Sequence, residues 1–409
     1  MALGEVQLER RLGTTDAVVL GLGSMIGAGV FAVLAPAAAV AGNNLLVGLA
    51  GAAVIAYCNA TSTARCAARY PESGGAYVYG RRRLGHFWGY LAGWGFVVGK
   101  TASCAAAALT VGSYAWPAQA HATAVVAVIA LTTINYAGIQ KSVLVTRIIV
   151  AVVLASLAAV AILALTAPHT HFDRIAIGAG ASIHGVLQAT GLLFFAFAGY
   201  ARIATLGEEV RDPARTIPRA IPLALGIALV VYAVVTVAVL SVLGGPRLAQ
   251  SAAPLADAVR VAGVVGCEPA VRAVAVLAAL GSLLALILGV SRTTFAMARD
   301  RYLPRQLSAV HRKFKTPYRA EVAVGVVVAI LAGTTDVRSA IGFSSFAVLV
   351  YYAIANASAW TLGGRIIPTM GFIGCVVVAL ALPLNSVILG TVVMLIGVTV
   401  YVLRRRLPS

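Results

Sequence analysis

The stretch Gly21-Leu22-Gly23-Ser24-Met25-Ile26-Gly27-Ala28-Gly29-Val30-Phe31 places four glycines inside a long apolar segment. A second interruption, Phe194-Phe195-Ala196-Phe197-Ala198-Gly199-Tyr200-Ala201, lies at a matching place in the second half of the chain. In a bilayer, unpaired backbone groups cost several kcal/mol each unless they line a cavity or are buried in protein. Two such breaks therefore indicate a binding site near the membrane midplane. The alternative is that the glycines only let helices cross closely.

The composition is that of a helical membrane protein. Hydrophobic residues make up 60% of the 409 residues and charged residues 11%, against about 25% charged residues in soluble domains. A span needs about 20 apolar residues. The apolar runs predict an all-α membrane protein with twelve spans, at 15–41, 44–68, 86–115, 121–138, 143–167, 183–206, 218–243, 270–298, 320–334, 338–361, 366–382 and 384–403.

The net charge of +18 does not indicate nucleic-acid binding, because the basic residues flank predicted spans and do not form one face. They gather in alternate loops, within 65–83, 211–219, 299–319 and 404–406. This bias places those loops in the cytoplasm. With an even number of spans, we expect a multi-pass protein of the cell membrane with both termini cytoplasmic.

The twelve predicted spans form a single transporter domain over residues 1–409. Spans one to five (15–167) and six to ten (183–361) each begin with a broken helix, which predicts a 5+5 inverted repeat followed by two extra helices (366–403). The five cysteines include no C-x-x-C pair, and we expect neither a metal site nor a cofactor.

Four stretches together resemble the amino acid–polyamine–organocation superfamily, within its amino-acid permeases. They are the first glycine-rich stretch, Tyr70 to Tyr77, Phe194 to Ala220, and Ser291-Arg292 through Pro304. The resemblance covers roughly residues 14–365. It implies the fold of the bacterial leucine transporter, alternating access and an amino-acid-like substrate.

The two breaks predict how a zwitterion is bound. The half-helix after Gly27 presents free N–H groups, suited to a carboxylate, and the half-helix ending near Ala198 presents C=O groups, suited to an ammonium. The resemblance implies an aromatic gate at Phe195. It also implies a neutral or small substrate, because no acid lies near Ala201. The predicted substrate-binding residues are Ser24, Met25, Ile26, Gly27, Ala28, Gly29, Val30, Phe195, Phe197, Ala198, Gly199 and Ala201.

Lys100 lies near the middle of the third predicted span, where a lysine should face the bundle interior or water. It either titrates during transport, contacts an anionic group of the substrate, or bonds backbone carbonyls as a structural residue. In the family that the chain resembles, some proton-coupled members use a lysine in the fifth span in place of a sodium ion, but the predicted fifth span here, 143–167, holds none. A sodium site built from carbonyls near Gly23 and the hydroxyl of Ser291 is the alternative.

Charged residues follow the second break. Arg202 either favours an acidic substrate or pairs with Glu208 or Glu209, and the three are candidate gating residues. The cluster of Glu208, Glu209, Arg211 and Asp212 predicts a latch for a gate on the cytoplasmic side, with solvation of these charges alone as the alternative. The leading hypothesis is a proton-coupled amino-acid permease, with an amino-acid or amine exchanger as the alternative. A channel would need repeated polar rings and an enzyme would need converging catalytic groups. The sequence displays neither pattern.

Overall fold

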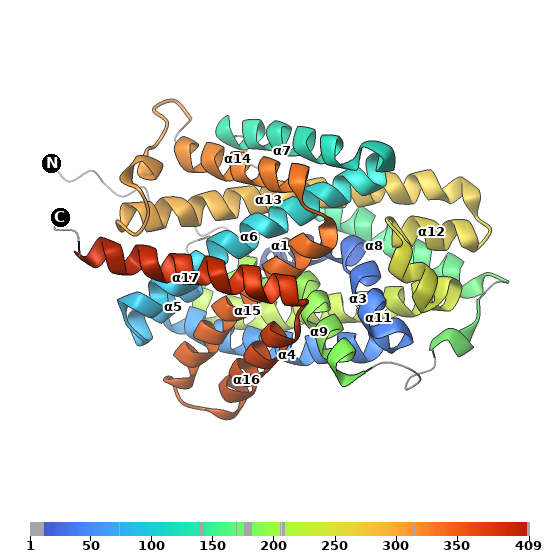
Figure 1. Cartoon of the computed structure of the whole chain (residues 1–409), viewed down its shortest axis with the longest axis horizontal. Helices are drawn as coiled ribbons and strands as arrows, with labels where there is room; N and C mark the ends of the chain where they lie inside the picture. Colours follow the sequence, from blue (N-terminus) through green and yellow to red (C-terminus); the bar gives the residue numbers. More distant parts are fainter. Residues whose placement is uncertain are drawn as a thin grey trace.

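The computed structural model describes residues 12–72, 74–138, 143–168, 170–175, 182–204, 206, 209–314 and 316–406. Its secondary structure there is helical, apart from an isolated parallel β-bridge between Leu12 and Val210. Most of the long helices run side by side along the long axis of the molecule (Figure 1). Residues 1–11, the segment 139–142 and Glu208 lie outside the described residues.

Ten helices or continuous helical runs in the described part are long and apolar enough to cross a membrane. They are Thr14–Ala32, Leu34–Arg69, His86–Ala115, Pro117–Tyr136, Val143–Thr166, Ile183–Ala204, Pro213–Gln250, Glu268–Arg299, Val337–Trp360 and Leu384–Arg404. The chain is therefore a multi-pass membrane protein. The two remaining predicted spans correspond to shorter helices, α14 (Tyr318–Thr334) and α16 (Ile366–Ala381). At about 1.5 Å per residue, each is shorter than a typical hydrocarbon core of about 30 Å.

The helix limits follow the predicted spans closely at most positions. The uninterrupted helices are α4 (Leu45–Arg69), α6 (His86–Ala115), α7 (Ala120–Tyr136), α8 (Val143–Thr166), α13 (Glu268–Arg299), α15 (Val337–Trp360) and α17 (Leu384–Arg406). The seventh span is longer than predicted, because α11 (Pro213–Gln250) begins five residues before the expected start. Pro213 occupies the first turn, where its missing N–H has no helical partner to lose. A kink at Gly244 divides α11 near its far end.

Two helices lie in stretches that we expected to be loops. They are α5 (Ala76–Arg83) and α12 (Pro254–Val261). Helix α5 starts after Gly75, whose φ of +56° is a left-handed conformation that favours glycine. A Cβ on Gly75 would also lie 2.4 Å from the hydroxyl oxygen of Tyr351. The start of α5 therefore requires glycine on two grounds.

The first and sixth predicted spans are interrupted where their glycines lie. The first consists of α1 (Thr14–Met25), a non-helical segment at 26–28, α2 (Gly29–Ala32) and α3 (Leu34–Ala41). The sixth consists of α9 (Ile183–Phe197), the 3-10 turn η4 (Ala198–Tyr200) and α10 (Ala201–Ala204). At the first break the chain leaves the helical conformation over three residues. At the second break one 3-10 turn separates two α-helical segments.

The interrupted helices lie inside the bundle. Helix α6 packs against α13 and α15, and α1 packs against α8 and α11. Helices α7 and α14 lie side by side on one flank and α17 runs along the surface (Figure 1). Their outward side chains are large and apolar, as a lipid-facing surface requires, for example Val126, Ile129, Ile330, Leu389 and Leu395.

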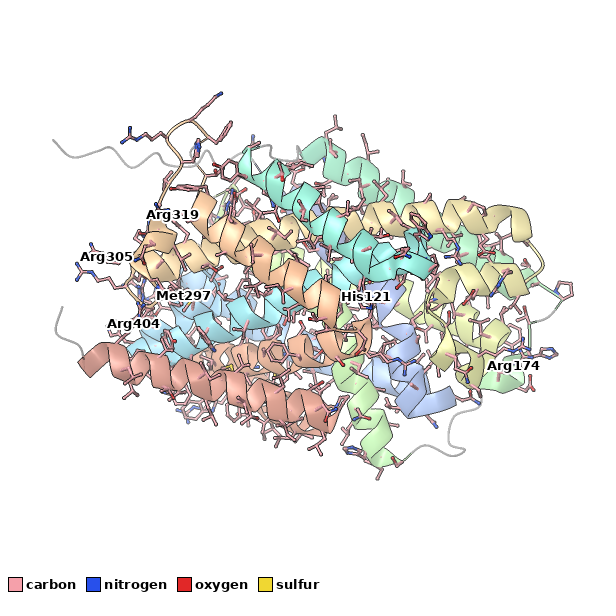
Figure 2. All side chains as sticks on the ribbon, turned by 45° about the horizontal axis from the view of Figure 1, so that its top comes forward. His121, Arg174, Met297, Arg305, Arg319 and Arg404 are labelled. Atoms are coloured by element: carbon pink, nitrogen blue, oxygen red, sulfur yellow. The ribbon has the colours of Figure 1, made fainter. Side chains whose placement is uncertain are left out.

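Basic side chains mark one end of the bundle. Figure 2 places Arg305, Arg319 and Arg404 together at one end and Arg174 at the other. Arg404 also donates to the carbonyl oxygen of Arg301 at 2.9 Å, which ties the end of α17 to the loop after α13. We call the end that carries Arg305, Arg319 and Arg404 the basic end, and the end that carries Arg174 the opposite end.

Candidate functional site

Helix α1 stops at a set of unpaired backbone donors. The N–H of Ile26 still bonds to the carbonyl oxygen of Leu22 at 2.7 Å. Among the described residues, the N–H groups of Gly27, Ala28 and Gly29 donate to no backbone acceptor. All three residues are buried. Free donors at a helix start are normally satisfied by side chains, water or a ligand, so this segment offers hydrogen bonds to a bound anion.

The backbone acceptors of the sixth-span break are met by side chains from other helices. The carbonyl oxygen of Ala198 accepts from Lys100 Nζ at 3.2 Å and lies 3.4 Å from the hydroxyl of Tyr352. The hydroxyl of Tyr232 on α11 lies 3.0 Å from the carbonyl oxygen of Ala196. Buried backbone carbonyls need such partners. The sequence did not single out Tyr232 or Tyr352, although a tyrosine inside an apolar span signals a hydroxyl that needs a partner.

The two breaks touch one another. A Cβ on Gly199 would lie 2.4 Å from the carbonyl oxygen of Ser24, and a Cβ on Gly29 would lie 2.8 Å from Cα of Ala196. Only glycine permits backbones to approach this closely. These two glycines therefore serve helix crossing, which was the alternative reading of the sequence, at the same place where the helices are interrupted.

Two neighbouring cavities flank the breaks, of about 230 Å³ and 280 Å³. The first is bordered by Gly23, Ser24, Ile26 and Gly27 from the first break. The second is bordered by Lys100 and by residues of the sixth span, Ala198, Gly199 and Ala201. Both share Ser24, Arg202, Glu209, Ala285 and Arg292. The cavities therefore join the two breaks to a group of charged side chains.

The charges along these cavities are mostly positive. Arg202 forms an ion pair with Glu209, with 3.9 Å between Nη2 and Oε1. Within the described residues, Lys100 and Arg292 have no carboxylate at ion-pair distance. The Arg202 pairing is one of the two that the sequence suggested, whereas Glu208 is not described. Arg292 appeared in the sequence only as part of a motif, and its side chain borders both cavities.

Tyr77 of α5 also borders the second cavity, and its hydroxyl donates to Asp300. Burial, together with this hydrogen bond, raises the pKa of the Tyr77 hydroxyl above its usual range. The hydroxyl therefore stays protonated at physiological pH and keeps donating to Asp300. Arg81 pairs with the same carboxylate at 2.9 Å. Two side chains of α5 therefore bond to Asp300, the residue that follows α13, and this fixes α5 beside the second cavity.

The remaining predicted site residues border neither of these two cavities. They are Met25, Ala28, Gly29, Val30, Phe195, Phe197 and Ser291. The carbonyl oxygen of Met25 accepts from Tyr232 at 2.7 Å, and the ring of Phe197 packs edge-on against Tyr232. The hydroxyl of Ser291 is buried and donates to the carbonyl oxygen of Ile287 within its own helix. Phe195 is half-buried. Their roles in binding stay predictions.

A third cavity, of about 280 Å³, lies beyond the first break and is bordered by Phe31, Tyr114 and Asp336. The rings of Phe31 and Tyr114 pack edge-on, 5.7 Å apart, and the hydroxyl of Tyr114 donates to the carbonyl oxygen of Phe31 at 3.3 Å. Both side chains are almost fully buried. The Phe31–Tyr114 contact therefore forms part of the wall of this third cavity.

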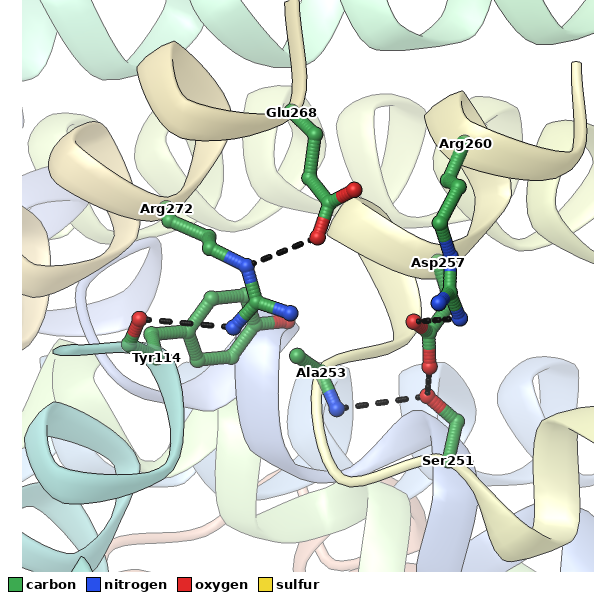
Figure 3. Close-up of polar contacts among 7 residues, drawn as sticks. All are labelled: Tyr114, Ser251, Ala253, Asp257, Arg260, Glu268 and Arg272. Carbon is green, nitrogen blue, oxygen red and sulfur yellow. Dashed lines mark hydrogen bonds and ion pairs between the residues drawn. The ribbon is translucent and has the colours of Figure 1, made fainter. Parts of the chain in front are cut away.

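Salt bridges brace this region around Tyr114 (Figure 3). Arg272 pairs with Glu268 at 2.9 Å and donates to the carbonyl oxygen of Tyr114 at 3.4 Å. Nearby, Asp257 pairs with Arg260 at 2.7 Å and accepts from the hydroxyl of Ser251. The first set of contacts joins the start of α13 to the end of α6, and the second joins α12 to Ser251, the residue after α11. In the described part of the chain, no group of three or more His, Cys, Asp or Glu residues is placed to hold a metal ion.

The comparisons with known proteins agree with this architecture. Residues 12–404 match the family model described as amino acid permease. The chain therefore belongs to the amino acid permease family, whose members are transporters.

Three relatives illustrate the range of the family. An uncharacterised transporter of Mycobacterium tuberculosis is 69% identical, over 98% of this chain and 92% of its own length. A branched-chain amino acid permease of Bacillus subtilis is 27% identical, over 99% of this chain and 95% of its own. A methylthioribose transporter of the same organism is 25% identical, over 80% and 75% respectively. The substrates in these two last names differ, so family membership alone does not fix the substrate of this chain.

Proposed function

We propose that this chain is a secondary active transporter that moves amino acids across the cell membrane by alternating access. The observation that carries the proposal is the meeting of two interrupted helices beside two cavities, with free N–H groups on one break and carbonyl oxygens on the other. Such a pair of backbone ends matches the two charged groups of an amino-acid zwitterion. Ser24, Gly27, Ala198 and Gly199 are the residues proposed to contact them.

The proposed architecture is twelve spans with an inverted 5+5 repeat. The helix contacts support it. If each of the first five spans is replaced by its counterpart in the second five (one by six, two by seven, and so on) and the reverse, a contact that is present becomes another contact that is present. The contact between α1 and α11 becomes that between α9 and α4, and the contact between α6 and α15 becomes that between α13 and α8. The pairs α4 with α11, α6 with α13, and α7 with α14 map onto themselves. All of these contacts are present.

We further propose that the basic end is cytoplasmic, in line with the positive-inside bias. Arg202 and Glu209 then belong to a cytoplasmic gate. The β-bridge ties this gate to the segment before α1, because the N–H of Leu12 bonds to the carbonyl oxygen of Glu209 at 3.1 Å and the N–H of Arg211 bonds to that of Leu12 at 2.8 Å. The Phe31–Tyr114 contact would close the site on the other side. We propose coupling to protons, with sodium coupling and amino-acid or amine exchange as the alternatives. Transport assays distinguish the three.

The test is amino-acid counterflow in proteoliposomes. Vesicles that contain the purified chain are loaded with one unlabelled amino acid at a time, and uptake of the same labelled amino acid is followed against protein-free vesicles. A thermal-shift screen at two pH values, with and without sodium, selects the amino acids, because a ligand that binds only the folded state raises its apparent stability. Saturable counterflow is the expected result. Ohmic current without counterflow, or no flux of any amino acid, would overturn the proposal.

A further inference from the structure

Lys100 holds the backbone oxygen at which an ammonium group would bind. Its Nζ lies 3.2 Å from the carbonyl oxygen of Ala198, and the side chain is buried with 6% of its surface exposed. This oxygen lies in the turn that interrupts the sixth span, and Ala198 borders the second of the two central cavities. A lysine side chain ends in a primary alkylammonium, the same chemical group that an amino acid carries at its α-carbon.

The Ala198 oxygen has no capacity for a second ammonium. A carbonyl oxygen offers two lone pairs, and the hydroxyl of Tyr352 lies 3.4 Å from the same atom. The nearby carbonyl oxygen of Ala196 lies 3.0 Å from the hydroxyl of Tyr232, which also lies 2.7 Å from the carbonyl oxygen of Met25. Among the described residues that border the second cavity, Glu209 is the one acid, and it is paired with Arg202. A bound amino acid therefore meets a subsite that is already filled.

We propose that Lys100 is a built-in occupant of the ammonium subsite, and that an amino acid binds productively only when its own ammonium displaces Lys100 from the Ala198 oxygen. This inference rests on the proposed function, because it concerns the site where an amino acid would bind. Lys100 then acts as an internal competitor. It satisfies the Ala198 oxygen in the empty site, where an unpaired buried carbonyl would be costly, and it lowers the affinity for every ligand that needs this oxygen.

The opposite role for Lys100 would be to attract the carboxylate of the substrate. The two roles predict opposite results when the ammonium is removed. A competitor weakens amino-acid binding, so its removal strengthens it. A carboxylate partner strengthens binding, so its removal weakens it. Ligands that have a carboxylate but no α-ammonium separate the two roles, because the competitor does not stand in their way.

The experiment compares Lys100→Met with the unmodified protein in detergent. Four amino acids are each paired with the carboxylate that lacks the α-ammonium: alanine with propanoate, leucine with 4-methylpentanoate, glutamate with pentanedioate, and lysine with 6-aminohexanoate. Dissociation constants are measured by competition and by direct calorimetry. We expect Lys100→Met to raise the preference for the bound amino acid over its partner by at least about tenfold, the scale of one charge-assisted hydrogen bond. A preference that stays the same or falls would overturn the inference.

Two matched variants control for structure and charge. Lys100→Arg keeps a cation beside Ala198 and is expected to keep the preference of the unmodified protein. Tyr352→Phe removes the other donor to the Ala198 oxygen without changing the charge, and is expected to change the preference far less than Lys100→Met. The midpoint of thermal unfolding confirms that each variant is folded. If Lys100→Met fails to fold, Lys100→Gln replaces it.

A density map of the unmodified protein with its amino acid bound gives an independent reading. The inference expects Lys100 Nζ to lie beyond hydrogen-bond distance of the Ala198 oxygen, and a retained Lys100–Ala198 bond beside a bound ligand would overturn it. Binding of an amino acid to Lys100→Met but not to the unmodified protein supports the inference. Binding to the unmodified protein with an unchanged preference in the variant removes the inference and leaves the proposed function intact. No amino-acid binding to any variant removes both.

Discussion

The hydroxyl oxygen of Tyr232 lies 2.7 Å from the carbonyl oxygen of Met25, the last residue of α1. The same hydroxyl lies 3.0 Å from the carbonyl oxygen of Ala196 in α9. A phenol has a single proton, so it can donate fully to one carbonyl at a time. One side chain of α11 therefore lies within hydrogen-bond distance of a carbonyl at the end of α1 and of another near the end of α9. The two carbonyls are 171 positions apart in the sequence (196 minus 25).

Replacing Tyr232 with phenylalanine should weaken the junction between the two breaks. The change keeps the ring and leaves both buried carbonyls without this donor. Hydrogen bonds inside membrane proteins contribute about 0.6 kcal/mol on average and up to about 1.7 kcal/mol. We expect a fall of that size in the free energy of unfolding and a lower thermal midpoint in detergent. Tyr57→Phe is the matched control, because Tyr57 is exposed on α4. Equal midpoints for the two variants would contradict the assigned role.

Gly199→Ala should impair the site itself. The added methyl group would lie 2.4 Å from the carbonyl oxygen of Ser24 and 2.7 Å from the backbone nitrogen of Met25. Neither backbone atom can swing aside, so the two breaks must separate, at a cost of about 1–3 kcal/mol. We expect a fall in both thermal midpoint and counterflow rate. The control is Gly226→Ala in α11, where an added Cβ meets nothing within 4 Å. That variant should keep full counterflow, and a similar loss in both would reject the account.

The Arg202–Glu209 pair should control the rate of opening toward the basic end. Its atoms are 3.9 Å apart, and both side chains are less than one-third exposed. We expect Arg202→Glu and Glu209→Arg each to change the counterflow rate, and the double charge swap that combines them to recover part of the original rate. The recovery should be partial, because arginine and glutamate differ in length and because a glutamate at position 202 would also lie beside Arg292, which borders the same cavities. A swap that behaves as the sum of two single changes would show that the pair does not act as a unit.

Asp336 gives a pH-dependent prediction outside the spans. Partial burial alone would raise the pKa of this carboxyl, but hydrogen bonds from the Ser339 hydroxyl and N–H lower it below the ordinary value. A lowered pKa means that the ionised form stabilises the start of α15 above the unfolded-state pKa of about 3.9, and that this contribution disappears as the pH falls through the folded-state value. Asp336→Ala should cost about 0.5–2 kcal/mol at pH 7.

The measurement is the thermal midpoint of both proteins from pH 7 down to pH 3. The gap between the unmodified protein and Asp336→Ala should be widest near neutrality and should close in acid. Asp336→Asn retains a capping side chain without a charge, so it should lose less at pH 7, and the difference between its midpoint and that of Asp336→Ala should not depend on pH. A gap that is constant from pH 7 to pH 3 would argue against the ionised cap.

The sequence predicts the bundle well because its signals are local. Apolar runs set the helix limits, and glycine clusters set the two interruptions, including the break at 26–28. The short helices α14 and α16 are the weakest part of the twelve-span prediction, because apolar runs of 17 and 16 residues give little margin for crossing a membrane.

The contacts that shape the site could not be predicted from the sequence, because they join residues that are far apart in it. Lys100 was recognisable as a buried lysine, but its bond to Ala198 crosses 98 positions. The Tyr351 hydroxyl at the start of α5 bonds to the N–H of Ala76, 275 positions away. The predicted spans left 76–83 as a loop, and the start of the helix there is set by two glycines with positive φ and by a tyrosine from α15.

A density map of the protein with an amino acid bound, chosen by the thermal-shift screen, tests the central claim most directly. We predict density for the ligand between the Ser24–Gly27 segment and the Ala198–Gly199 turn, with its carboxylate toward the free N–H groups of the first break. Ligand density confined to the cavity beside Asp336, or to the lipid-facing surface, would contradict the account.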